Sequence, residues 1–279
     1  MKKISRRSFL AAAAVSAAAL ALTACGGSAS TASSAAASSV AASSEAASTS
    51  AAAELTTVEA GKLTMATNAA FPPYEMTTDA GEFEGIDVDT AKAIAEKLGL
   101  ELQIDDMDFD AALLSVQQGK ADIVMAGVTV TDERKAVMDF SDSYATGIQS
   151  IIVPEGSDIT SPDDLAGKKI GTQRGTTGYI YCSDDFGDEN VVAYDDGLTA
   201  VQALNNGQVD AVVIDNAPAK EFVAANPGLV ILDTSYAEED YAIGLAKGSA
   251  LEDAVNAALE ELKADGTLQS IVDKYITAE

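Results

Sequence analysis

Two arginines stand out in a chain that is otherwise strongly acidic. The 279 residues include 44 Asp and Glu against 17 Lys and Arg, and no His. Apart from Arg6 and Arg7 near the N-terminus, the arginines of the sequence are Arg134 and Arg174. A guanidinium group binds a carboxylate through two parallel hydrogen bonds, which an ammonium group does poorly. We therefore expect Arg134, which follows an apolar stretch, to bind the carboxylate of a small ligand.

Asp215 is the natural counterpart of this arginine. It ends the apolar run Ala211–Ile214, where burial of a carboxylate is costly unless it is paired. An ammonium group would be a fitting partner, and Phe71 and Phe109 could pack against the rest of the ligand. Together these groups suit an α-amino acid. Two or three charge-assisted hydrogen bonds at about 1.5–3 kcal/mol each, with aromatic burial, could supply the ~8 kcal/mol of a micromolar complex.

Each of these residues also has a purely structural interpretation. Arg134 could form an ion pair with Asp139 or Asp142. Asp215 could cap a helix that begins near Asn216, and the two phenylalanines could belong to the core. The second arginine could point either toward a ligand or outward, because side chains alternate along a strand.

The order of the predicted elements indicates an α/β fold that can position such a site. Strand and helix patterns alternate in the order strand, helix, strand, helix, strand, over residues 62–67, 87–98, 100–104, 109–118 and 122–126. We expect Asp87 to cap the first helix and Gly99 to end it. The pattern then returns, so that Gly119 matches Gly207 and Asp122 matches Asp210.

This repetition predicts two lobes, each an open sheet flanked by helices. We expect residues 61–146 and 245–279 to form one lobe and residues 147–244 the other. Two crossings, near 146–149 and 241–245, would then form a hinge. Apolar spacing over residues 251–262 and 268–275 predicts two helices that cover the first lobe.

Ligands of open α/β sheets bind outside the carboxyl ends of the strands. This rule selects the loop from Asn68 to Phe71, the segment from Ala126 to Thr129, the segment from Gln173 to Gly178, and Asp215. Gly127 would let a ligand approach the backbone closely. Thr131 is expected to cap the turn that leads to Arg134. A helix that begins near Thr176 and Thr177 would favour an anion at its start.

The N-terminus has the features of an export signal. Residues 1–24 contain a basic start with paired arginines, as in twin-arginine signals, and an Ala/Leu-rich run. The run ends at Leu22–Cys25, which resembles a bacterial lipobox; an ordinary signal with an accidental cysteine is the alternative. We expect residues 25–60 to comprise a lipidated Cys25 and a flexible Ser/Ala tether. The folded part would then be held at the outer face of the cell membrane.

Composition argues against several other classes of protein. The formal net charge of −27 would repel a phosphate backbone, so nucleic acid is not an expected partner. Two cysteines and no histidine leave too few ligands for a zinc site or a disulfide framework. We expect no cofactor and no metal, a monomer, and an inert Cys182.

Several short motifs resemble the polar amino-acid binding proteins of ABC importers, which belong to family 3 and have a two-lobe, type II periplasmic-binding-protein fold. The motifs are Phe-Pro-Pro-Tyr-Glu at 71–75, Gly-Ile-Asp-Val-Asp at 85–89, Gly-Lys-Ala-Asp at 119–122, Val-Thr-Asp-Glu-Arg-Lys at 130–135, Phe-Ser-Asp-Ser-Tyr at 140–144 and Gly-Thr-Thr at 175–177. The resemblance spans about residues 62–276. It implies capture of an amino acid by closure of the lobes and delivery to a membrane permease.

The resemblance also implies roles for individual residues. Arg134 would bind the α-carboxylate and Asp215 the α-ammonium group, with Phe71 and Phe109 on either side of the ligand. The cleft would further be lined by Ala126, Thr129, Gln173, Thr176 and Thr177. Many relatives that bind basic amino acids have an acid where this sequence has Asn68. We therefore expect a neutral polar ligand first, and an acidic one only if Arg174 points inward.

Two other functions are compatible with the same fold. An enzyme similar to cyclohexadienyl dehydratase would use Glu75, Asp108 or Asp215 as a general acid. A sensor domain would need a separate signalling partner. The tether, the anchor and the arrangement for binding an amino acid favour the transport protein over both.

Overall fold

The computed structural model describes residues 55–276. The predicted signal segment, Cys25 and most of the tether lie outside these residues. None of the helices in the described part is both long and apolar enough to span a membrane.

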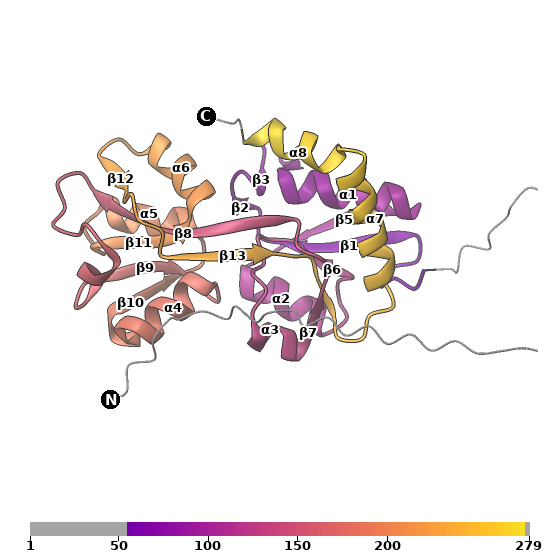
Figure 1. Cartoon of the computed structure of the whole chain (residues 1–279), viewed down its shortest axis with the longest axis horizontal. Coiled ribbons are helices and arrows are strands. Elements are labelled where there is room, and N and C mark those ends of the chain that lie inside the picture. Colours follow the sequence, from indigo (N-terminus) through magenta and orange to yellow (C-terminus); the bar gives the residue numbers. More distant parts are fainter. Residues whose placement is uncertain (1–54, 277–279) are drawn as a thin grey trace, which may run out of the picture. The chain divides into compact units, whose positions relative to one another are not determined.

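The described residues form two α/β lobes, each built on its own sheet (Figure 1). The first lobe has the strand order β5-β1-β6-β14-β7, in which β1 is parallel to β5 and β6, and β14 is antiparallel to β6 and β7. Its strands are β1 (Lys62–Thr67), β5 (Glu101–Asp106), β6 (Ile123–Val124), β7 (Met138–Phe140) and β14 (Gly244–Ala246). A small second sheet holds β2 (Ala70–Phe71), β3 (Glu75–Thr77) and β4 (Phe83–Glu84).

Helices from both ends of the described chain cover the first sheet. They are α1 (Ile86–Leu98), α2 (Phe109–Gln117), α3 (Asp132–Val137), α7 (Glu252–Ala264) and α8 (Thr267–Tyr275). As expected, the two C-terminal helices pack on the first lobe: Lys97 of α1 donates hydrogen bonds to Glu261 and Asp265. The predicted cap of α1 is wrong. The helix starts after Gly85, and Asp87 lies fully buried inside the first turn with its carboxylate facing the protein interior.

The second lobe repeats this plan with the strand order β10-β9-β11-β8-β12. Its strands are β8 (Ala145–Pro154), β9 (Ile170–Gln173), β10 (Val191–Tyr194), β11 (Ala211–Asp215), β12 (Leu229–Ile231) and β13 (Ala237–Tyr241). Its helices are α4 (Thr177–Phe186), α5 (Gly197–Asn205) and α6 (Asn216–Ala225), with short 3-10 turns at Pro162–Leu165 and Asp188–Asn190.

The matched glycines and aspartates of the two halves have the same local roles. Gly119 and Gly207 both adopt positive φ, 65° and 68°, just after α2 and α5. Asp122 accepts a hydrogen bond at 2.8 Å from the backbone N–H of Thr64, and Asp210 does the same from Lys169. Each carboxylate therefore ties the start of one strand, β6 or β11, to the neighbouring parallel strand, at β1 or at the start of β9.

The lobes are joined by a two-stranded antiparallel ribbon. Strands β8 and β13 pair from Ala145↔Tyr241 to Gln149↔Ala237 and run between the lobes (Figure 1). Both crossings are therefore backbone-paired to each other. Such a ribbon can bend while keeping its hydrogen bonds, which suits a hinge.

Candidate ligand-binding site

A small cavity lies between the lobes, where the carboxyl ends of both sheets meet. We call it the ligand cavity. Its lining is formed by Asn68, Phe71, Glu75, Phe109, Ala126, Gly127, Thr129, Arg134, Gln173, Thr176, Thr177 and Asp215. All of the residues predicted from the sequence for the cleft are among them, together with Glu75. The volume is only about 20 Å³, so the lobes enclose it closely and must separate before an amino acid can enter.

Arg134 is buried, and backbone carbonyl groups orient its guanidinium. Nη1 donates to the carbonyl of Thr129 at 2.8 Å, and Nη2 donates to the carbonyl of Gly175, in the other lobe, at 3.1 Å. The guanidinium also lies 5.4 Å from the centre of the Phe109 ring, within range of a cation–π contact. The predicted cap is present, since Thr131 Oγ1 accepts from Arg134 N at 3.2 Å. A guanidinium has five N–H donors, so donors remain for a ligand carboxylate.

The structural alternative for Arg134 is wrong. Asp139 pairs with Lys247 at 2.6 Å, and Asp142 uses its backbone N–H on Asn256. Among the described residues, Arg134 has no acidic partner within ion-pair distance. Burial lowers the pKa of Arg134, and Glu239 and Asp215 act in the opposite direction. The group stays charged, because the pKa of arginine starts far above neutrality.

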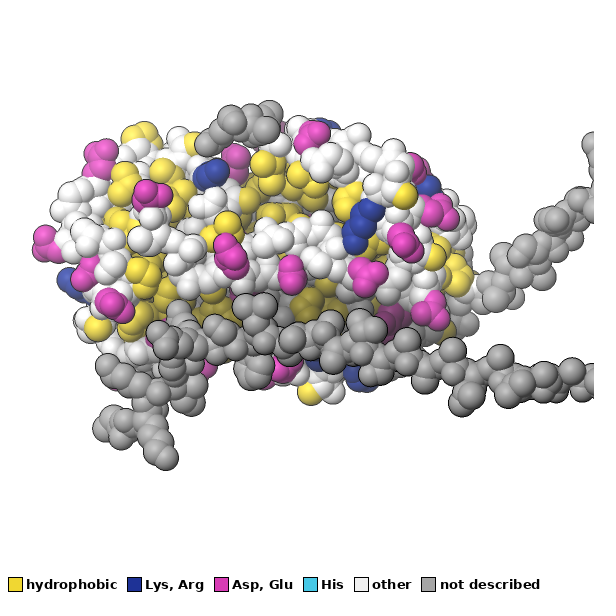
Figure 2. All heavy atoms as spheres, viewed as in Figure 1, with side chains coloured by type: hydrophobic (Ala, Val, Ile, Leu, Met, Phe, Trp, Pro, Cys, Tyr) yellow, Lys and Arg dark blue, Asp and Glu magenta, His cyan; other side chains and the backbone are white. Residues whose placement is uncertain are grey.

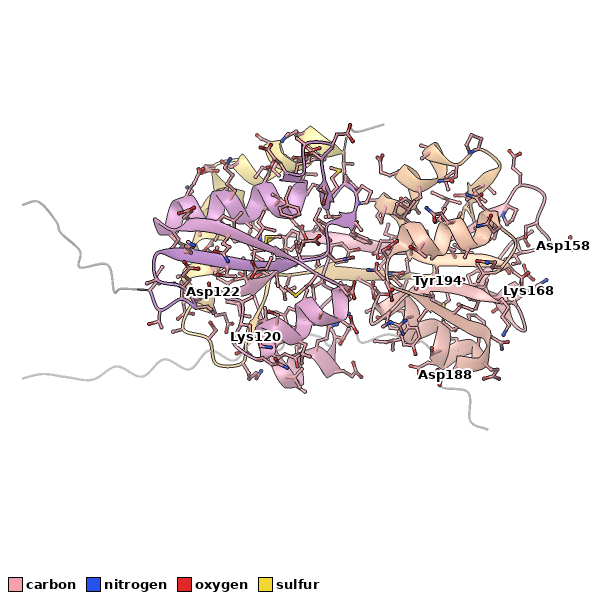
Figure 3. The ribbon with its side chains drawn as sticks, turned by 180° about the vertical axis from the view of Figure 1, so that it is seen from behind. Lys120, Asp122, Asp158, Lys168, Asp188 and Tyr194 are labelled. Carbon is pink, nitrogen blue, oxygen red and sulfur yellow. The ribbon has the colours of Figure 1, made fainter. Side chains whose placement is uncertain are left out.

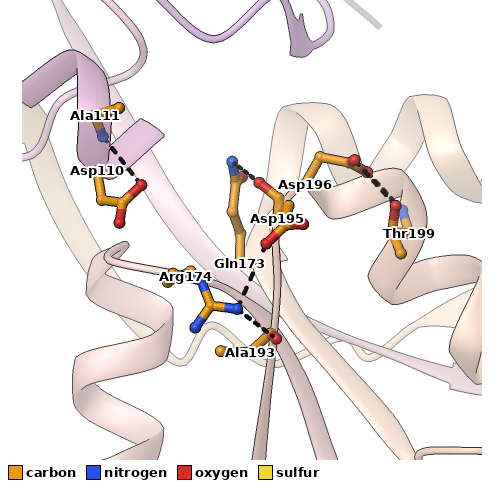
Figure 4. Close-up of polar contacts among 8 residues, drawn as sticks. All are labelled: Asp110, Ala111, Gln173, Arg174, Ala193, Asp195, Asp196 and Thr199. Carbon is orange, nitrogen blue, oxygen red and sulfur yellow. Dashed lines mark hydrogen bonds and ion pairs between the residues drawn. The ribbon is translucent and has the colours of Figure 1, made fainter. Parts of the chain in front are cut away.

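Arg174 points away from the cavity. Its side chain is half-exposed, and Nη2 lies 3.5 Å from both Asp195 Oδ1 and the carbonyl of Ala193 (Figure 4). The preceding residue, Gln173, turns inward and is buried. Side chains alternate in direction along a strand, so these two neighbours at the end of β9 point to opposite sides. An acidic ligand that depends on Arg174 is therefore not supported.

Asp215 is buried at the end of β11 and occupies the N-cap position of α6, as the structural alternative expected, but its side chain makes no capping hydrogen bond. Its Oδ2 accepts from Gln149 Nε2 at 2.8 Å, and its Oδ1 accepts from the hydroxyl of Tyr241. Burial raises the pKa of Asp215 to about 7, against the hydrogen bond from Tyr241. A carboxylate can accept about four hydrogen bonds, which leaves capacity for an ammonium group.

Asn68 connects the two lobes at the cavity. Its Nδ2 donates to the carbonyl of Met107 at 3.0 Å, and its Oδ1 accepts from Gln173 Nε2 at 2.8 Å. Gln173 donates also to the carbonyl of Asp195 at 3.2 Å. The amide of Asn68 thus has a donor and an acceptor already engaged with the protein.

Gly127 lies against two aromatic rings that leave no room for a side chain. Its φ is +54°, and an added Cβ would lie 2.8 Å from Phe71 and 3.3 Å from Tyr241. Its N–H donates to Asp87 at 2.9 Å, so it is not left for a ligand. The absence of a side chain therefore leaves room for the ring of Phe71, which lines the cavity, and for the ring of Tyr241 behind it.

Threonine hydroxyls from both lobes meet at a buried carboxylate that the sequence did not suggest. Glu239, on β13, accepts from Thr129 Oγ1 at 3.2 Å, from Thr177 Oγ1 at 2.9 Å and from Gln149 Nε2 at 2.9 Å. Thr176 serves as the N-cap of α4 and accepts from Tyr179 N. Glu239 lies within a run of acids in an acid-rich chain, so its sequence carries no signal of this role.

Glu75 was considered from the sequence only as a general acid of the enzyme alternative, yet it lines the ligand cavity. It is completely buried, and neither carboxylate oxygen accepts a hydrogen bond from a donor among the described residues, although the carboxyl of Asp87 lies beside it. Burial, followed by the neighbouring charges of Asp87 and Asp215, raises the pKa of Glu75 well above its usual range. Burial also raises the pKa of Asp87 to about 6. Protonated Glu75 can donate to Asp87, whereas ionised Glu75 needs a donor from elsewhere. The available signal in the sequence was an acidic residue directly after the run Phe-Pro-Pro-Tyr at 71–74.

A larger cavity of about 410 Å³, the rear cavity, lies between Tyr74 and Tyr275 of the first lobe and α6 of the second. Arg134 and the phenylalanines do not line it, so it lacks the groups that would hold a carboxylate. Asp215 is the residue that borders both cavities. We therefore assign the small ligand to the enclosed cavity.

The two-lobe α/β architecture, the paired hinge strands and the charged cavity between the lobes define a solute-binding protein of the type that closes on its ligand. The chain belongs to the bacterial extracellular solute-binding proteins, family 3, whose family model matches residues 63–278.

Relatives with established names agree with this family. The chain is 33% identical over 226 residues to the L-cystine-binding protein TcyJ of Escherichia coli, covering 79% of this chain and 85% of the relative. It is 34% identical to the arginine-binding extracellular protein ArtP of Bacillus subtilis, covering 78% and 87%. Among solved structures, the arginine-, lysine-, histidine-binding protein ArtJ of Geobacillus stearothermophilus aligns with a TM-score of 0.75 at 35% identity, covering 78% and 96%.

Proposed function

We propose that this protein is the substrate-binding component of an ABC importer for an amino acid, and that the favoured ligand has a cationic side chain. Arg134 would take the α-carboxylate and Asp215 the α-ammonium group. The named relatives support this function, since they are binding proteins for cystine, arginine and other amino acids. They give no support to the dehydratase alternative.

The proposal for the ligand class rests on the buried charged groups around the cavity, which are mostly acidic. Four carboxyl groups are buried in or beside the cavity, those of Glu75, Asp87, Asp215 and Glu239, against the single buried cation of Arg134. A zwitterion adds no net charge to this set, whereas a cationic amino acid adds one positive charge. Glu75 supplies the counter-charge that Asn68 cannot, so the expectation of a neutral ligand changes. The carboxyl of Glu75, which lines the cavity and accepts no hydrogen bond from the described residues, is the observation on which this rests.

Delivery would follow from the hinge. A ligand that contacts both lobes stabilises the closed form by its difference in affinity for the two forms. A membrane permease would then recognise the closed shape. We further propose that the protein is monomeric and that Cys25 is lipidated, so that the tether holds the lobes near the membrane.

Calorimetric titration tests both the amino-acid binding function and the preference for a cationic side chain. The ligands are L-arginine, L-lysine, L-histidine, L-glutamine, L-cystine and L-glutamate. We expect the cationic amino acids to bind with micromolar or tighter dissociation constants and L-glutamate not to bind. If glutamine or cystine bound most tightly, the ligand class would be wrong and the amino-acid receptor would stand. If none of the amino acids bound, the receptor proposal itself would fail.

A further inference from the structure

Tyr241 occupies a position that links the hinge to the ligand cavity. It is the last residue of β13, is fully buried, and pairs with Ala145 at the end of the hinge ribbon. Its ring packs edge-on against Tyr74, with centroids 5.3 Å apart. Its hydroxyl reaches Asp215 at the end of β11, in the second lobe.

Two glycines make room for this ring. An added Cβ at Gly147, on the hinge strand β8, would lie 2.5 Å from the Tyr241 ring, and one at Gly127 would lie 3.3 Å from it. The ring is therefore held between the hinge and the binding loop of the first lobe. Such confinement fixes the position of the hydroxyl oxygen, and the O–H bond can then turn toward Asp215.

The two cavities show why Asp215 needs this donor. Asp215 lines both the ligand cavity and the rear cavity, and Tyr241 lines the rear one. The hydroxyl engages Oδ1, while Gln149 engages Oδ2. The remaining acceptor capacity is thus directed to the side where the ammonium group would sit.

We propose that Tyr241 is a positioning residue for ligand binding: its hydroxyl keeps the Asp215 carboxylate ionised and aimed at the ammonium group of the amino acid. The inference rests on the proposed function, because it takes Asp215 as the ammonium acceptor. It adds that the affinity depends on a residue of the hinge strand that does not line the ligand cavity.

Several groups around Asp215 affect its ionisation, and some of them oppose the effect of the Tyr241 hydroxyl. Glu239 lies on the same strand as Tyr241, Tyr74 and Glu75 face Asp215 from the first lobe, and Arg134 acts from α3. Lys220 of α6 borders the rear cavity beside it. The acids and burial favour a protonated Asp215, and the hydroxyl favours an ionised one.

The test is the pH dependence of the affinity for L-arginine, or for whichever amino acid binds the wild-type protein, in the variant Tyr241→Phe. In the wild type the pKa of Asp215 is about 7, so its ionisation contributes about a tenfold gain in affinity between pH 6 and pH 8. Loss of the donor raises this pKa further. We expect Tyr241→Phe to gain more than the wild type over this range, approaching ~100-fold, and to approach wild-type affinity near pH 8.5.

Tyr74→Phe is the matched control, because it removes a hydroxyl from the adjacent buried ring without removing a bond to Asp215. It should keep the wild-type pH profile. A loss of affinity in Tyr241→Phe that is equal at every pH would make Tyr241 a packing residue and overturn the inference. An unchanged affinity and profile would overturn it too. Absence of amino-acid binding by the wild type would instead contradict the proposed function.

Discussion

At the scale of single residues, the polar groups of the cavity fall into two sets. Some are hydrogen-bonded within the protein, and others still have capacity for a ligand. The amide of Asn68 and the N–H of Gly127 are engaged by neighbouring side chains and backbone. Glu75 and part of the Arg134 guanidinium are not. Unsatisfied buried polar groups are costly, so a complementary ligand gains affinity by satisfying them.

Replacement of Glu75 by Gln tests the ligand class at this scale. The amide keeps the shape but cannot become an anion, so the affinity for L-arginine should fall by at least about tenfold, while the affinity for L-glutamine should change little. Calorimetry in two buffers should also show protons released when L-arginine binds the wild type, and fewer released in Glu75→Gln. Equal loss for both amino acids would instead indicate a structural role for Glu75 with Asp87.

Much of the site could be predicted from residue type and from position at strand ends. Arg134, Asp215 and both phenylalanines follow from that reasoning, and all of them line the cavity. Glu239 and Tyr241 could not be found in this way, because they belong to the hinge strand and act on the cavity only through the residues that they contact, Glu239 through two threonines and Tyr241 through Asp215. Their sequence neighbourhood is merely acidic. The direction in which Arg174 points was equally undetermined until β9 was placed.

At the scale of elements, each lobe is tied together by one aspartate of the helix–glycine–strand pattern. Asp122 is buried and accepts from the backbone of Val58 at 2.7 Å and of Thr64 at 2.8 Å. Asp210 is exposed and accepts from Lys169. Figure 3 shows Asp122 well away from the junction of the lobes, so its role is in folding and not in binding.

Asp122→Ala should therefore lower the free energy of unfolding by about 2–3 kcal/mol, since one buried and one part-buried N–H group lose a charged acceptor. Asp210→Ala should cost less, about 1 kcal/mol, because its environment is exposed to water. Denaturant unfolding measures both values. The affinity for the ligand should stay within twofold of the wild type in each variant. A large loss of affinity would mean that the lobe interior is coupled to the cleft.

The sequence pattern predicted the α/β class and both crossings, but it did not define every boundary. Strand β6 is only Ile123–Val124, shorter than the predicted 122–126, because the turn at Gly127 follows so closely. The pairing of β8 with β13 joins segments far apart in the chain, and no local pattern encodes it. The lobe boundaries at 146/147 and 244/245 stay predictions.

At the scale of the whole molecule, negative charge dominates both the surface and the cleft. Figure 2 shows Asp and Glu side chains spread over both lobes on the face in view, and the formal net charge is −27. Glu75, Asp87 and Asp215 have raised pKa values in the folded protein, the last two at about 6 and about 7. A raised carboxyl pKa contributes stability below the unfolded pKa, and this contribution is lost as pH rises through the folded pKa.

The ligand-free protein should accordingly be more stable at pH 5 than at pH 8, with the loss beginning above the ordinary carboxyl pKa of about 4 and levelling off above the folded pKa values of about 6 and about 7. Thermal unfolding in the absence of ligand measures this. Surface repulsion acts in the same direction, but salt screens it, whereas the buried carboxyls are screened little. The difference should therefore persist at 0.5 M salt and shrink in Asp215→Asn. Equal stability at the two pH values in high salt would contradict ionisation of the buried acids.

We propose that a buried arginine and a buried aspartate, one from each lobe, hold the α-carboxylate and the α-ammonium group of an amino acid. The most direct test of this proposal compares the dissociation constant of the cognate amino acid for Arg134→Ala and Arg174→Ala. Because Arg134 would make charge-assisted hydrogen bonds worth about 1.5–3 kcal/mol each, its removal should weaken binding by at least about 100-fold. Removal of the half-exposed Arg174 should change binding less than twofold. Near-wild-type affinity of Arg134→Ala, or an equal loss in both variants, would contradict the account.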